Sequence, residues 1–209
     1  MEVYIMEFKT LKISKMTGKL ADFQALNTNT LTNKFCQDMQ KSDSICSKCY
    51  SWEMLNGMRK SCQPAWQHNS DLLSQPLEEY QIPTILAAVF RFSGHGELIN
   101  ETHLDNIVRI ARKNPHCRGM ALWTKRKDIV RKYFDKHDKP ENLILIWSNP
   151  KIDKVITADK APKYFDKVFN NVDKNNPDYE QNCTGQKCRD CLACYSLDSG
   201  TDTIIEAVK

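Results

Sequence analysis

Three cysteines near the N-terminus have a spacing that could bind a reactive metal ion or cluster. Cys36 is followed by Cys46 and Cys49, so the last two have the C-x-x-C spacing that aims two thiolates at one metal ion or cluster. Three ligands leave one coordination position open, and an open position is where a metal centre can react. Cys62 is expected in the core, but a zinc site that uses it as the fourth ligand is the alternative.

A second group of cysteines lies near the C-terminus and is denser than the first. It comprises Cys183, Cys188, Cys191 and Cys194. The first three have the spacing of plant-type ferredoxin ligands, and the last three match the run in bacterial ferredoxins. Four thiolates also suit a structural zinc ion, so the spacing leaves iron–sulfur and zinc open. Because four ligands leave no open position, we expect a structural centre or an electron relay here.

Composition bounds the class of protein. The chain has 209 residues, 41% hydrophobic and 27% charged, and a net charge of +4, which is typical of a globular protein with no bias toward nucleic acid. Nine cysteines without a recognisable export signal favour metal ligands over disulfides, which are rare in reducing compartments. No run of about 18 apolar residues occurs, so we expect no membrane span and a cytoplasmic location.

Alternating strands and helices must position these cysteines. The N-terminal alternation, with a turn at Gly18, predicts a strand pair, and Pro64 is expected to split a helical stretch over residues 50–73. The apolar run 84–92 predicts a strand buried on both faces. Further strands are expected over 119–123, 142–147, 155–158, around 165–172 and over 203–208, and helices over 101–113 and 125–136.

This order predicts a single α/β domain with a mostly parallel sheet that forms a partial or complete barrel. Residues 1–182 would form the core. Residues 183–209 would form a cysteine-rich segment and a final strand packed on it. Asn149 and Pro150 are expected to stop the strand that precedes them.

The predicted strand over 84–92 ends in a glycine-rich turn, Ser93-Gly-His-Gly-Glu97. Ligands of parallel α/β proteins bind where loops leave the carboxyl ends of the strands. Gly94 and Gly96 would let the backbone approach a ligand, and Glu97 could hold an amino group. The alternative is a tight turn capped by polar residues. Arg91, inside the apolar run, needs a partner for its charge.

Other strand ends would meet at the same rim of a parallel sheet. Thr124, Lys125, Ser148 and Asn149 are the candidates. The alternative is equally open, with Lys125 at an exposed helix start and Ser148 and Asn149 in a turn. Cys117 and the four tryptophans are expected in the core, and no histidine outside the glycine-rich turn is expected to bind a metal.

Several blocks together resemble the phage "gene product 88" family. They are Ser14–Gly18, the Cys46–Tyr50 block, Asn69, Arg91–Glu97, Trp123–Lys125, residues 142–148 and the C-terminal cysteine cluster. The three-cysteine loop, followed by a strand that ends in Ser-Gly-x-Gly-Glu, also resembles the core of radical S-adenosylmethionine enzymes. The spacing here is C-x9-C-x2-C, where that superfamily usually has C-x3-C-x2-C.

The second resemblance implies a site. Cys36, Cys46 and Cys49 would hold a [4Fe–4S] cluster whose open iron binds the amino acid part of S-adenosylmethionine. Gly94, Gly96 and Glu97 would then form the cofactor loop, with His95 standing where glycine is common.

The resulting hypothesis is an iron–sulfur enzyme of phage or prophage type. It would take electrons from a donor and use a 5′-deoxyadenosyl radical on an unknown substrate, such as a nucleic acid or nucleotide precursor. One alternative is a zinc- or cluster-stabilised module that binds nucleic acid or protein without catalysis. Another is an enzyme that binds its substrate directly at the open iron.

Overall fold

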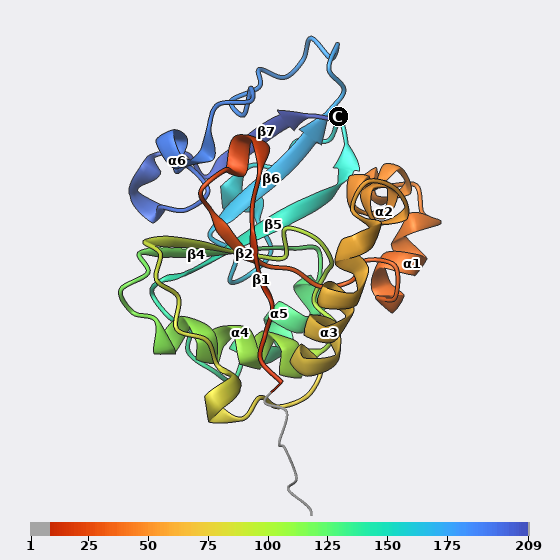
Figure 1. The fold of residues 1–209 in the computed structure, drawn as a ribbon. Helices are drawn as coiled ribbons and strands as arrows, with labels where there is room; N and C mark the ends of the chain where they lie inside the picture. The colour runs from red at the N-terminus through yellow and green to blue at the C-terminus, as the bar shows by residue number, and fades with distance from the viewer. Residues whose placement is uncertain (1–8, 209) are drawn as a thin grey trace, which may run out of the picture.

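A computed structural model describes residues 9–208 and shows one seven-stranded sheet. The strands are β1 (Ile13–Lys15), β2 (Gln24–Leu26), β3 (Val89–Phe92), β4 (Gly119–Thr124), β5 (Leu143–Ile152), β6 (Lys167–Val172) and β7 (Thr203–Ala207). They lie in sequential order; β1 is antiparallel to β2, and every other neighbouring pair is parallel (Figure 1). The predicted single α/β domain with a mostly parallel sheet is confirmed. Among residues 9–208 no pairing joins β7 to β1.

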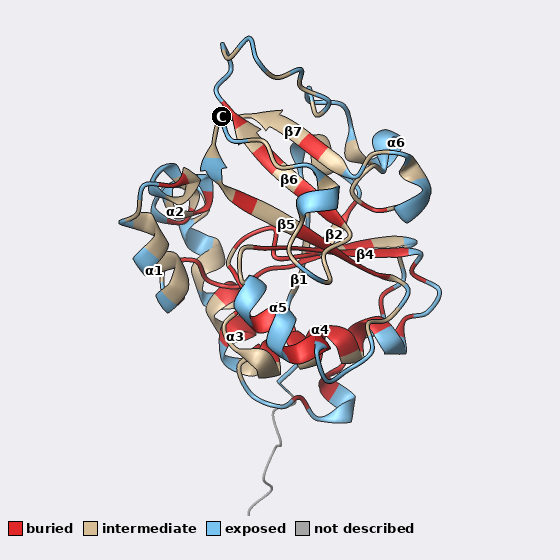
Figure 2. Ribbon diagram, turned by 180° about the vertical axis from the view of Figure 1, so that it is seen from behind, coloured by how far each residue is buried: buried red, intermediate tan, exposed pale blue. Residues whose placement is uncertain are grey.

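The helices are α1 (Lys34–Gln40), α2 (Tyr50–Asn56), α3 (Gln63–Leu73), α4 (Glu101–Lys113), α5 (Lys127–Phe134) and α6 (Cys188–Cys191). α3, α4 and α5 lie together on one side of the sheet, and the buried stripes of α4 and α5 are plain in Figure 2. α4 begins where its capping residue Asn100 accepts a hydrogen bond from the His103 amide at 2.9 Å. None of the helices in residues 9–208 is long and apolar enough to cross a membrane.

Different segments of the chain pack against the two faces of the sheet. Phe90 and Phe92 of β3 point toward α3–α5 and join the larger core. On the opposite face a smaller core holds Trp123 of β4 together with Tyr195 from the cysteine-rich tail. A Cβ atom on Gly119 would lie 1.9 Å from the Tyr195 carbonyl oxygen, so the tail packs directly against the start of β4. The C-terminal segment therefore packs against the face of the sheet opposite the larger core.

Two strand predictions are wrong at their ends. The apolar run 84–92 forms a strand only from Val89, and Leu86 is 90% exposed. β5 does not stop at Asn149 and Pro150 but continues to Ile152, because an irregularity in its register with β6 accommodates a residue that has no amide to donate.

The strand predicted over residues 155–158 is also wrong, since only a short helical turn, Ala158–Lys160, forms there. The other expected elements are confirmed, including the N-terminal strand pair, the break before α3, and the strands β6 and β7. The part of the N-terminal alternation that includes Val3, Ile5 and Phe8 lies outside the described residues.

Candidate functional site

Capping interactions position the three N-terminal cysteines. Cys36 lies in the first turns of α1, where its amide donates to the side chain of the capping residue Asn33 at 3.2 Å. The Cys46 amide donates to the Ser44 hydroxyl at 3.2 Å, which starts a short helical turn over Ile45–Lys48. Cys49 then caps α2. Each cysteine is therefore fixed by a local helix start, although nine residues separate Cys36 from Cys46.

The three thiols meet a carboxylate and an amine at one edge of the sheet. Burial raises the pKa of the Cys36 thiol, and the neighbouring Glu97, Cys49 and Cys46 raise it further, whereas Lys125 lowers it. Burial also raises the pKa of Cys46, and Lys125 again opposes the shift. Because charges in a protein are screened over about 10 Å, these five groups lie within electrostatic range of one another. Metal binding to Cys36 and Cys46 would therefore need to displace their protons against burial.

No single ion fits either cysteine group in this structure. Among residues 9–208, no three His, Cys, Asp or Glu side chains converge closely enough to hold a metal ion. A tetrahedral zinc ion requires thiolates about 2.3 Å from one point. In an iron–sulfur cluster each cysteine binds its own iron, so the thiols lie farther apart than around one ion. The assignments of iron–sulfur and zinc stay predictions.

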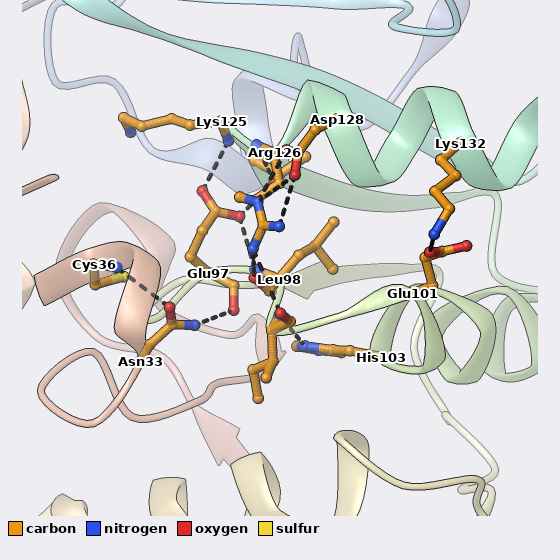
Figure 3. Close-up of polar contacts among 12 residues, drawn as sticks. Asn33, Cys36, Glu97, Leu98, Glu101, His103, Lys125, Arg126, Asp128 and Lys132 are labelled. Atoms are coloured by element: carbon orange, nitrogen blue, oxygen red, sulfur yellow. Dashed lines mark hydrogen bonds and ion pairs between the residues drawn. The ribbon is translucent and has the colours of Figure 1, made fainter. Parts of the chain in front are cut away.

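Glu97 ties the end of β3 to the end of β4 (Figure 3). Its Oε1 accepts hydrogen bonds from the Leu98 amide at 2.8 Å and from the Thr124 hydroxyl, and its Oε2 accepts from the Lys125 amide at 2.8 Å. A carboxylate offers about four acceptor positions, so one remains on Oε2. Burial raises the pKa of Glu97, and Lys125 opposes the shift. The turn thus holds a buried carboxylate near the cysteines, with one acceptor position on Oε2 that these three hydrogen bonds do not use.

The two glycines of the turn are explained by the chain itself. A Cβ atom on Gly96, where φ is +84°, would lie 2.0 Å from the Thr28 hydroxyl oxygen and 2.7 Å from its carbonyl oxygen. One on Gly94 would lie 2.8 Å from Asn27 Oδ1. The predicted close approach is therefore seen, but to the segment that follows β2. Whether a ligand also approaches the turn stays a prediction.

His95 is held as a neutral ring in the middle of the turn. It stacks on Trp66 with ring centroids 4.3 Å apart, and its Nδ1 lies 2.8 Å from the Ser51 hydroxyl. Burial, followed by the charges of Arg59 and Arg91, lowers the pKa of His95 to about 3. This residue occupies the position where glycine is common in the family with the resembling turn, and here it fills space against α3.

The other rim residues divide into two groups. Lys125 Nζ donates to the Ser148 hydroxyl at 2.8 Å, and Thr124 binds Glu97, so these three residues share the edge that carries the cysteines. Asn149 is buried and donates to Asn170 Oδ1 at 2.9 Å, which supports the irregular part of β5 instead.

The C-terminal cysteines line one cavity. All four contribute to a pocket of about 250 Å³ that Tyr195 also lines. Lys19 Nζ lies 3.5 Å from Cys183 Sγ. Burial raises the pKa of Cys194 to about 12, and the nearby Arg91 opposes the shift. The structure therefore brings these four residues to one cavity, with Arg91 and the Lys19–Glu206 ion pair nearby.

The two remaining cysteines lie elsewhere. Cys117 is buried, and its thiol donates to the Ala87 carbonyl at 2.8 Å, as expected for a core cysteine. Cys62 lies at the start of α3, and it is not among the groups that shift the pKa of Cys36 or Cys46.

These features define an α/β protein with a cysteine-rich loop and a buried carboxylate at the carboxyl edge of a sequentially ordered sheet. The chain belongs to the gene product 88 family, whose model matches residues 9–198. The predicted phage gene-product family is thereby confirmed. No curated protein and no solved structure matches the chain.

Proposed function

We propose that this protein is an iron–sulfur enzyme similar to radical S-adenosylmethionine enzymes. Cys36, Cys46 and Cys49 would hold a [4Fe–4S] cluster, and Gly94–Glu97 would contact the cofactor. The observation that carries the proposal is that Cys46, Cys49, Glu97 and Lys125 all act electrostatically on the Cys36 thiol, at the carboxyl edge of the sheet. Six parallel strands in sequential order also suit a partial barrel, the architecture expected from the resemblance.

The donor set suits a three-cysteine cluster with an open iron. The largest charges that act on Cys36 come from Glu97, Cys49, Cys46 and Lys125, and those that act on Cys46 come from Lys125, Cys49 and Glu97. When bound, the cluster would supply the electron that splits S-adenosylmethionine. The remaining acceptor position of Glu97 Oε2 suits the amino group of that cofactor.

The chain's own groups have separate tasks. Lys125 offsets the negative charge that three thiolates and Glu97 bring together, which lowers the cost of holding them deprotonated. Tyr50, which donates to the Gly94 carbonyl at 2.5 Å, fixes the cysteine loop to the glycine-rich turn. A second cluster at the C-terminal cysteines would act as an electron relay, since its four thiolates leave no open position.

The test is anaerobic reconstitution with iron and sulfide, followed by incubation with S-adenosylmethionine and a reductant. We expect 5′-deoxyadenosine to form and the electron paramagnetic resonance spectrum of the reduced protein to change when the cofactor is added. A Glu97→Gln variant should keep its iron and bind the cofactor more weakly, because the amide is uncharged and has only one acceptor oxygen.

Two results would contradict the proposal. One is a reconstituted protein with intact clusters, no 5′-deoxyadenosine and an unchanged spectrum. The other is a colourless protein with about two zinc ions per chain, which four-thiolate zinc chemistry would produce and which favours a non-enzymatic binding module.

A further inference from the structure

Five buried polar side-chain atoms have no hydrogen-bond partner within the described part of the chain. They are Asn27 Nδ2, Thr28 Oγ1, Arg59 Nε, Arg91 Nε and the Tyr195 hydroxyl. Folded proteins leave few such atoms, and each calls for a specific explanation, such as an ion or a ligand. All five can donate a hydrogen bond, so the set as a whole is suited to an acceptor.

Three of these donors lie against the glycine-rich turn. The Cβ position of Gly94 is 2.8 Å from Asn27 Oδ1 and 3.3 Å from Arg91 Nε. Thr28 packs against Gly96 in the same turn. The Asn27 side chain is fully buried and already uses its oxygen to accept from the His95 amide at 3.0 Å, so its amide group is the part that lacks a partner.

The second arginine approaches from α2 and its following loop. Arg59 donates to the Thr17 hydroxyl at 3.0 Å, next to Met16, whose methyl group lies 3.4 Å from the Cβ position of Gly94. Both arginines also lower the pKa of His95, which lies in the middle of the same turn.

In the described part of the chain no carboxylate neutralises either arginine, although the charge of Arg91 also acts on the Cys194 thiol and the Tyr195 hydroxyl. Within residues 9–208, no ion pair joins Arg59 or Arg91 to a carboxylate. Arg91 instead lies over the Trp123 ring, 4.0 Å from its centroid. A guanidinium nitrogen that is withdrawn from water without a hydrogen-bond partner is costly, so the two buried Nε atoms favour an anionic acceptor.

We propose that Arg59, Arg91 and the Asn27 amide bind a phosphate group of the substrate on this face of the glycine-rich turn. Guanidinium groups match the oxygens of phosphate in geometry, and two of them balance its two negative charges. A singly charged carboxylate would leave one arginine uncompensated. The inference goes beyond the proposed function, because Arg59 and Asn27 have no part in the proposed cluster chemistry.

The glycine-rich turn links the proposed phosphate-binding donors to the three-cysteine loop. The Gly94 carbonyl, on the same turn, accepts a hydrogen bond from Tyr50 next to Cys49. A phosphorylated substrate anchored at Arg91 would therefore extend toward the three-cysteine loop. The substrate class is a phosphate monoester, such as a mononucleotide or a nucleic acid end.

The test is calorimetric titration of the full-length protein with inorganic phosphate in a chloride buffer, with iron content measured on the same sample. We expect saturable one-to-one binding and, by mass action, a higher melting temperature in phosphate. Arg91→Gln and Arg59→Gln should each weaken binding at least about tenfold, as expected for loss of a charged hydrogen bond. Arg131→Gln makes the same change in net charge at a side chain that is 75% exposed, and it should bind as the wild type does.

Stability separates a binding role from a structural one. Because no carboxylate among residues 9–208 pairs with Arg91, Arg91→Gln without phosphate should melt at or above the wild-type temperature. A lower melting temperature with unchanged phosphate affinity would assign Arg91 to packing on Trp123 and overturn the proposal.

Three further results would also overturn the proposal: no binding of phosphate by the wild type, equal binding of acetate, or wild-type affinity in both arginine variants. Because phosphate binding is read without turnover and beside the iron content, its failure is distinct from a failure of the cluster chemistry.

Discussion

Replacing Gly96 by alanine should destabilise the protein by about 2–5 kcal/mol. The backbone at Gly96 has φ of +84°, and an alanine in that region costs about 1–2 kcal/mol relative to glycine. The new Cβ atom would also lie 2.0 Å from the Thr28 hydroxyl oxygen and 2.7 Å from its carbonyl oxygen. The hydroxyl can rotate away but the carbonyl belongs to the backbone, so overpacking adds about 1–3 kcal/mol.

Gly185 provides the matched control. It has φ of +98°, and nothing lies within 4 Å of its Cβ position. Gly185→Ala should therefore show the backbone cost alone, about 1–2 kcal/mol. The assay is urea denaturation of both variants under one set of conditions. If Gly96→Ala costs no more than Gly185→Ala, the turn is not packed against Thr28 and the explanation of its glycines fails.

Two more predictions concern stability. Asn69→Ala should cost about 3 kcal/mol in urea denaturation, because its buried side chain bonds the Lys12 amide, the Lys12 carbonyl and the Asn27 carbonyl at 2.7–2.8 Å. Below about pH 6.5 stability should fall by up to about 1.4 kcal/mol per pH unit for each of His95 and His103. Burial lowers both pKa values to about 3, so between pH 3 and 6.5 the unfolded chain binds the proton and the folded chain does not.

These predictions have distinct checks. Asn69→Ala should be compared with Gln67→Ala. Gln67 also lies on α3, but its side chain forms hydrogen bonds only with other side chains. Equal losses of unfolding free energy in the two variants would contradict the role given to Asn69. For the histidines, urea midpoints at pH 7.5 and 5.5 are compared in the wild type and in His103→Gln. A wild type whose stability does not change over that range, or a variant with the same pH slope, would contradict buried neutral histidines.

Local sequence patterns predicted most of the fold. α4 was predictable because an asparagine cap precedes a stripe of buried apolar residues at helical spacing. The exposed stretch before β3 was not, since Leu86 lies in an apolar run whose backbone is held by distant groups. Asn114 accepts from the Ile85 amide at 2.6 Å, and the Arg118 amide donates to the Ala88 carbonyl at 2.7 Å. Such long-range bonds leave no periodic signal.

The candidate site was predicted in part for the same reason. The C-x-x-C spacing of Cys46 and Cys49 predicts a metal site. Glu97 lies in the turn after β3, and a parallel sheet brings the carboxyl ends of its strands to one rim. The packing of Thr28 against Gly96, and the approach of Arg59 to the same turn, join segments far apart in the chain. A single sequence carries no sign of such contacts beyond the unusual number of polar residues that follow β2.

The most direct test of the central claim is the iron content of the anaerobically reconstituted protein and of single-cysteine variants. The wild type should hold about eight irons per chain, as two [4Fe–4S] clusters require. Cys49→Ala should lose about four of them and keep the C-terminal cluster, whereas Cys62→Ala should lose none. A wild type that binds zinc but no iron, or a Cys49→Ala variant with full iron content, would contradict a cluster at Cys36, Cys46 and Cys49.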